Sequence, residues 1–384
     1  MRRPIVGLLL AIAVLTTSCS RGGDDVGAKK GKKDHPTATS TTTTSERGAI
    51  APSSLPPTNG CEGTATPKTE ATFIVGTKLF AAKVDGTGLR CLAVVGDVEE
   101  GAALDWAADA TRALVGTRIV AGSEGVAIGG LIGRPIALSD PAGKAVLSIT
   151  DDGRLMKTGA GVVGAPISFL ATTDTAIYHP SGRQIVAAGK AMDGVYGIWI
   201  AENDGTEAKR LVATETADKI TSLGWTSGGL LTFVALHGTS GHVHFLDLGA
   251  RTLTSLPDDR REPSGVVPST FEETKVAVTD GPCGRQTTRI ATWPPGESPA
   301  KAEHVSLGAV LGKLATTPVG WLDDGTLLLI VRPSGCTGPG SLWAWHPQRR
   351  EVEIARNVIA AAVRSRLTSP PQTSTVGPGD APPE

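Results

Sequence analysis

The chain has 384 residues and is nearly neutral, with 37 Lys and Arg against 38 Asp and Glu. This balance provides no strongly basic surface of the kind that binds nucleic acid, so we expect no nucleic-acid partner. Glycine is abundant, at 48 residues, and no long stretch follows the ~3.6-residue apolar period of a helix. The composition therefore favours an all-β protein that is rich in turns.

The first residues have the order of an export signal. Met1, Arg2 and Arg3 form a short positive segment, and the apolar run of residues 5–15 is shorter than the ~20 residues of a membrane span. Residues 15–19, Leu-Thr-Thr-Ser-Cys, resemble a bacterial lipobox. The resemblance implies that residues 1–18 are a lipoprotein signal peptide and that Cys19 is lipidated, with palmitate as an acyl group. The alternative is an ordinary secretory signal in which Cys19 is incidental.

Two segments have compositions that cannot bury a core. Residues 19–60 hold a lysine cluster, a run of Thr and Ser at 37–45 and several prolines, so we expect a disordered tether anchored by its lipid. Residues 367–384 are rich in Pro, Gly and Ser and are expected to form a disordered tail. The mature protein is thus expected at the cell membrane, lipid-anchored on the extracytoplasmic side, with the membrane as a partner through the N-terminal lipid.

Residues 61–366 remain for a folded domain, and they contain an internal repeat. An apolar strand that ends in a bulky residue is followed by a small polar turn and a second apolar strand. The copies span residues 104–115, 137–147, 177–186, 223–233, 269–278 and 319–330. The seven tryptophans fall on two positions of this repeat, the end of the first strand (Trp106, Trp225, Trp321) and the third strand (Trp199, Trp293, Trp343, Trp345). Sorting of this kind indicates a true repeat.

The repeats resemble those of TolB-like and WD-repeat β-propellers. The resemblance rests on turns such as residues 179–183, His-Pro-Ser-Gly-Arg, and on the Asp-Gly-Thr turns at 85–87 and 204–206. It implies a β-propeller of four-stranded blades. Residues 358–363 are expected to supply a first strand to a blade whose other strands lie at the N-terminal end, because this pairing closes the ring and removes exposed strand edges. Seven blades are favoured, and six are the alternative.

Four cysteines remain if Cys19 is lipidated, and an even number in an exported chain suggests disulfides in one of three pairings. The repeat register places Cys283 and Cys336 in matching loops of adjacent blades. Cys61 precedes the first strands of the blade whose outer strand carries Cys91. We therefore predict the bridges Cys61–Cys91 and Cys283–Cys336.

Motifs for catalysis or cofactor binding are weak in this sequence. There is no Gly-x-Ser-x-Gly elbow and no His-Glu-x-x-His pair, and the glycine pattern of residues 159–164 lies in a strand meander rather than before a helix. His237, His242 and His244 form a histidine cluster without a completing carboxylate, so a solvated hairpin is favoured over a metal site. His179 is the one acid–base residue that we place near the end of a first strand. We predict no catalytic residue, cofactor or metal.

These observations favour a non-catalytic lipoprotein of the cell envelope whose propeller binds a protein or glycan partner. The alternative is a propeller enzyme that acts on a sugar, lactone or peptide terminus in the central funnel. A purely structural envelope protein is a third interpretation. A converging set of carboxylates or histidines on the first strands would favour the enzyme.

Overall fold

The structure, a computed structural model, describes residues 60–364 except 67, 139–142, 160–161, 215–216, 239, 258–260 and 334–337. The predicted signal peptide, Cys19, most of the predicted tether and the predicted tail lie outside the described residues. Within the part that is described, no helix is long and apolar enough to cross a membrane.

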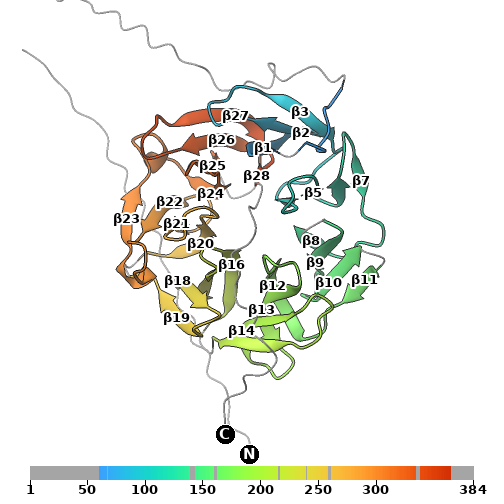
Figure 1. Cartoon of the computed structure of the whole chain (residues 1–384), viewed down its shortest axis with the longest axis vertical. Helices are drawn as coiled ribbons and strands as arrows, with labels where there is room; N and C mark the ends of the chain where they lie inside the picture. The colour runs from blue at the N-terminus through green and yellow to red at the C-terminus, as the bar shows by residue number, and fades with distance from the viewer. Residues whose placement is uncertain are drawn as a thin grey trace, which may run out of the picture. The chain divides into compact units, whose positions relative to one another are not determined.

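The described chain forms seven four-stranded antiparallel blades arranged in a ring (Figure 1). Blade 1 consists of β28 (Ala360–Arg364), β1 (Glu70–Val75), β2 (Lys78–Ala82) and β3 (Arg90–Val94), and blade 2 of β4 (Leu104–Trp106), β5 (Ala113–Val115), β6 (Arg118–Val120) and β7 (Gly125–Ala127). Blade 3 consists of β8 (Arg134–Leu138), β9 (Ala145–Ile149), β10 (Leu155–Gly159) and β11 (Val162–Pro166), and blade 4 of β12 (Leu170–Tyr178), β13 (Gln184–Ala191), β14 (Tyr196–Glu202) and β15 (Lys209–Ala213).

Blade 5 consists of β16 (Lys219–Trp225), β17 (Leu231–His237), β18 (Ser240–Asp247) and β19 (Thr252–Ser255). Blade 6 consists of β20 (Pro263–Pro268), β21 (Lys275–Asp280), β22 (Thr287–Thr292) and β23 (Glu303–Ser306), and blade 7 of β24 (Thr316–Trp321), β25 (Leu327–Val331), β26 (Gly340–Trp345) and β27 (Val352–Val358). Two short 3-10 helices, η2 (Pro299–Lys301) and η3 (Leu311–Lys313), lie between strands. The predicted all-β propeller is confirmed, with seven blades rather than six.

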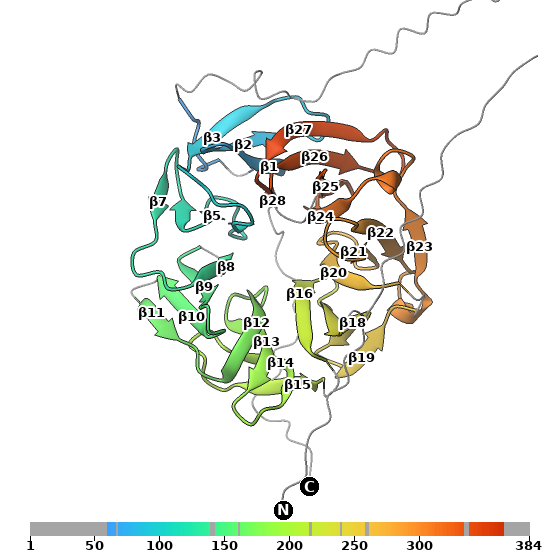
Figure 2. The ribbon, with the colours of Figure 1, turned by 180° about the vertical axis from the view of Figure 1, so that it is seen from behind.

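Blade 1 closes the ring with strands from both ends of the domain. β28 pairs antiparallel with β1, from Glu70 opposite Arg364 to Ile74 opposite Ala360. Figures 1 and 2, which view the ring from opposite sides, both place the last strands beside the first. The sequence-based prediction of this closure is confirmed, because β28 completes a sheet that would otherwise expose an edge.

Arg364, at the end of β28, is a clamp on this closure. Its side chain is fully buried, and its guanidinium donates hydrogen bonds to the carbonyl oxygens of Ala110 (3.0 Å), Thr64 (2.7 Å) and Thr66 (2.9 Å). It also lies 3.6 Å from the carboxylate of Glu70. The last strand is thereby tied to blade 2 and to the segment that precedes β1.

A disulfide holds the same segment from the outer edge of blade 1. Cys61 and Cys91 are bonded, as predicted, and they join the chain before β1 to β3. Cys283 is also disulfide-bonded, but Cys336 lies outside the described residues, so the pairing Cys283–Cys336 stays a prediction.

Indole side chains link neighbouring blades near the ring's centre. The Nε1–H of Trp225 donates to the carbonyl of Tyr178 (3.2 Å), and that of Trp321 donates to the carbonyl of Val267 (3.1 Å). In each pair the acceptor belongs to the innermost strand of the preceding blade. The tryptophans at the ends of first strands therefore fix the packing of one blade against the next.

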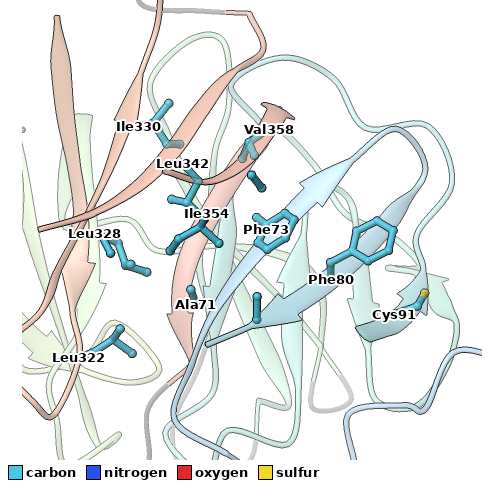
Figure 3. Packing of buried hydrophobic residues seen from close by; sticks show 13 residues of the cluster. Ala71, Phe73, Phe80, Cys91, Leu322, Leu328, Ile330, Leu342, Ile354 and Val358 are labelled. Carbon is cyan, nitrogen blue, oxygen red and sulfur yellow. The ribbon is translucent and has the colours of Figure 1, made fainter. Parts of the chain in front are cut away.

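The core between blades 7 and 1 is continuous across the point of closure. Buried side chains of blade 1, including Phe73 and Phe80, pack in one cluster with Leu328, Leu342 and Ile354 of blade 7 (Figure 3). Apolar contact of this kind supplies most of the free energy that favours folding. We call the contact between these two blades the seam.

Candidate functional site

The innermost strands carry more acidic groups than the sequence analysis identified. Besides His179, which follows β12, Asp105 lies on β4 and Asp174 on β12. The expectation that His179 is the one acid–base residue near the first strands was therefore wrong. The sequence did indicate Asp105, because it lies beside Trp106 at the end of the first strand of the repeat.

These two carboxylates are engaged in structural contacts. The Oδ2 atom of Asp105 accepts a hydrogen bond from the backbone N–H of Leu138 (2.9 Å), and that of Asp174 accepts one from Ile220 (2.9 Å). Each acceptor lies one blade before its donor. Burial raises the pKa of Asp174, although the bond from Ile220 opposes that shift. Both aspartates join one blade to the next.

His179 is held inside its own turn. Its Nδ1 accepts from the backbone N–H of Ser181 (3.1 Å) and lies 2.8 Å from the Ser181 hydroxyl, while the ring packs edge-on against Trp225. Burial lowers the pKa of His179. The neutral ring thus stabilises the turn between β12 and β13.

The histidine cluster is dispersed in the structure. His242 and His244 share β18 with ring centroids 6.2 Å apart, while His237 is largely exposed and faces the carboxylate of Asp218 at 3.4 Å. His244 packs on Phe233 and bonds Ser255. Among the described residues, no group of three His, Cys, Asp or Glu side chains is placed to hold a metal ion.

Aspartates of the repeated turns cap their own backbone. Asp85 Oδ1 accepts from both the backbone N–H and the hydroxyl of Thr87, and Asp204 does the same with Thr206. The hydroxyl contacts, above all, lower the pKa of both carboxyls. Asp152 and Asp324 also cap turns, through Thr150 and Thr326.

An open groove of about 280 Å³ lies at the seam, on the end of the blades that carries the third-to-fourth-strand turns. We call it the seam groove. Blade 1 contributes the turn between β2 and β3, and blade 7 contributes the ends of β26 and β27 and the turns beside them. The lining residues are Lys83, Val84, Asp85, Thr326, Ala344, Trp345, His346, Arg349, Arg350 and Val352.

The rim of the seam groove is cationic. Lys83, Arg349 and Arg350 line it, and Asp85 is the one acidic side chain of the lining. In the described part of the chain, the side chains of Lys83 and Arg350 enter no hydrogen bond or ion pair. Their cationic groups therefore have no direct side-chain partner, although the charge of Lys83 helps to lower the pKa of Asp85.

Arg349 is held in place by Asp324. Its guanidinium lies 2.5 Å from Asp324 Oδ2, and Asp324 Oδ1 accepts from the backbone N–H of Thr326 (3.0 Å). Burial alone would raise the pKa of Asp324, but hydrogen bonds from Thr326 and Arg349 outweigh it and lower that pKa. About half of the Arg349 side chain stays exposed, so its remaining N–H groups face solvent.

The floor of the seam groove is apolar and continuous with the core. Ala344 belongs to the seam cluster, and Val84 and Val352 pack against it. Trp345 also lines the groove, but its side chain is 6% exposed and packs toward blade 6 with Trp321 and Leu327. An apolar floor below a few polar groups is the usual make-up of a ligand pocket.

Comparison with known proteins yields similarity of fold only. No protein-family model and no curated protein matches the chain. Among solved structures, the chain is similar to TolB from Acinetobacter baumannii at 13% identity and a TM-score of 0.44, over 80% of this chain and 68% of that one. It is also similar to an oligogalacturonate lyase in complex with manganese, at 12% identity and a TM-score of 0.49, over 71% of this chain and 83% of that one. A chain of a nidogen–laminin complex matches at 13% identity and a TM-score of 0.45, over 78% and 99%.

Sequence reasoning missed the seam groove. Its residues come from three separate turns, and two of these turns are more than 200 residues apart in the chain. The ring closure brings them together. The short basic run at Arg349 and Arg350, directly after a third strand, was the only local signal.

Proposed function

We propose that this protein is a lipid-anchored binding protein of the cell envelope, whose propeller holds a protein or glycan partner and carries out no reaction. The supporting observation is the seam groove, in which cationic side chains surround an apolar floor. The inner-strand carboxylates, in contrast, are engaged by neighbouring backbone. A tether ending in lipid would keep a captured partner close to the membrane.

Lipidation at Cys19 is tested by Cys19→Ser. The substitution removes the acyl chains, so the variant should leave the membrane fraction, and the native protein should show the mass of a lipidated N-terminus beginning at residue 19. A native protein whose mass shows no acyl group at residue 19 would contradict the anchor.

Partner binding is tested by placing a photo-reactive amino acid at Gln348, which is exposed in the turn beside the seam groove. The matched control site is Asp193, exposed in the turn between β13 and β14 at the opposite end of its blade. Irradiation of cells should give one stoichiometric adduct from position 348 and none from position 193. Equal labelling from both sites, or no macromolecular adduct from either, would contradict the proposal.

A further inference from the structure

We propose that the seam groove binds an oxyanion, a carboxylate or phosphate, that is joined to a small apolar group. The inference rests on the proposed function in one respect, which is that the group is taken to belong to the captured partner.

The charged side chains that line the groove favour an anionic ligand. Three cationic side chains, Lys83, Arg349 and Arg350, line the groove with one carboxylate, that of Asp85. Asp324 pairs with Arg349 from outside the lining, so these five groups carry a net positive charge. Asp85 is already engaged by Thr87. An arginine whose guanidinium is fixed by a carboxylate on one side is well suited to grip a second oxyanion with its other N–H groups.

The volume of the groove and its apolar floor limit the apolar group of the ligand. The volume of about 280 Å³ corresponds to roughly nine water-sized groups, at ~30 Å³ each. Val84, Ala344 and Val352 offer this space an apolar surface. One monomer unit fits, such as a single acidic residue or a ring that bears a carboxylate. A longer chain would continue past the open side of the groove.

A ligand in this position would contact both blades of the seam. Lys83 and Val84 belong to blade 1, whereas Arg349 and Trp345 belong to blade 7. The closing strands β28 and β1 belong to blade 1, and the buried apolar cluster joins that blade to blade 7. Because a ligand that binds only the folded state stabilises it, an apolar oxyanion should raise the midpoint of thermal unfolding.

The test uses full-length protein in detergent and three probes of similar shape: benzoate, phenyl phosphate and the neutral benzamide. Calorimetric titration should detect binding of one or both anions, with a raised unfolding midpoint, and should detect much weaker binding of benzamide. Arg349→Gln combined with Arg350→Gln should weaken anion binding at least about tenfold. The matched control Arg356→Gln should not, because Arg356 is exposed on β27, is paired with Glu353 and lies outside the groove.

Two results would overturn the inference: equal binding of benzamide and both anions, or equal loss of anion binding in the double variant and in Arg356→Gln. The unfolding midpoint of each variant without probe shows whether it is folded. If the double variant is not folded, the single variant Lys83→Gln, on the other blade, provides an independent measurement of anion binding.

Competition separates this inference from the proposed function. If benzoate reduces the adduct formed at position 348, the oxyanion belongs to the captured partner. If benzoate binds but no partner is cross-linked, the groove chemistry stands and the proposed function fails, because the oxyanion is then a free solute. If a partner is cross-linked but no anion binds, the groove chemistry alone fails.

Discussion

His244 lies on β18, whereas His179 is held in the turn between β12 and β13. His244 is stacked on Phe233, with its Nδ1 2.8 Å from the hydroxyl of Ser255. Burial, and to a smaller extent the charge of His242, lowers the pKa of His244 to about 4. A cluster that resembles a metal site in the sequence thus contains a half-buried histidine that packs against its own blade.

This lowered pKa predicts a pH-dependent stability. The unfolded chain binds a proton to residue 244 near pH 6.5, while the folded chain binds it only near pH 4. The contribution of His244 is therefore present in full above pH 6.5 and is lost as pH falls to 4, by about 3 kcal/mol. Denaturant unfolding across this range should show a smaller decline in His244→Gln than in the native protein.

The matched control for this prediction is His237→Gln. His237 is largely exposed, so its replacement should leave the decline with pH unchanged. The same decline in His244→Gln as in the native protein would contradict the assignment of His244 as a buried neutral ring.

The repeated turns show how an element follows from short-range chemistry. In the Asp-Gly-Thr turns the central glycine has a positive φ, as at Gly86 and Gly205, and the aspartate caps the threonine two residues on. Residues 109–111, Asp-Ala-Thr, make the same caps with Ala110 at φ 55°. The glycine-based pattern identified the first two turns and missed the third, because surrounding contacts hold Ala110 in a region that favours glycine.

At the level of the strand, β28 is held by its hydrogen bonds to β1 and also by the side chain of Arg364. Arg364→Met would remove the contacts to Glu70 and to three backbone carbonyls, and would leave these buried acceptors unpaired. We expect a loss of about 3 kcal/mol in the free energy of unfolding. Chemical denaturation measures it.

The control for the clamp is Arg356→Met, on the neighbouring outer strand β27. Its side chain is more than half exposed and pairs with Glu353, so its loss should change stability by less than about 1 kcal/mol. Comparable effects of the two substitutions would show that Arg364 does not clamp the ring.

For the whole molecule, the sequence predicted the architecture well because propeller blades repeat the same local pattern. Five of the six strand pairs and the closing strand were readable from that pattern, whereas the first strand of the copy at 269–278 lies earlier, at Pro263–Pro268. The bridge Cys61–Cys91 followed from the register of the blades. Arg364 was not predicted as a clamp, since nothing in its sequence neighbourhood indicates that its partners lie at residues 64–70 and 110.

The seam groove could not be predicted for a related reason. Lys83 and Arg349 share no motif and come together only when β28 completes blade 1. Charges on turns are usually solvated, so the local sequence gives no sign that these residues surround an apolar floor. Prediction of the site required the closed ring in three dimensions.

We propose that the seam groove holds the partner of this protein at the membrane. The most direct measurement is mild cross-linking of the anchored protein in its own cells, followed by quantitative mass spectrometry of what co-purifies. The native chain is compared with Arg349→Gln/Arg350→Gln and with Arg356→Gln. We predict one stoichiometric partner. Its co-purified amount should be unchanged with Arg356→Gln and reduced about tenfold with the double variant. Retention of the same partner in full by the double variant would contradict it.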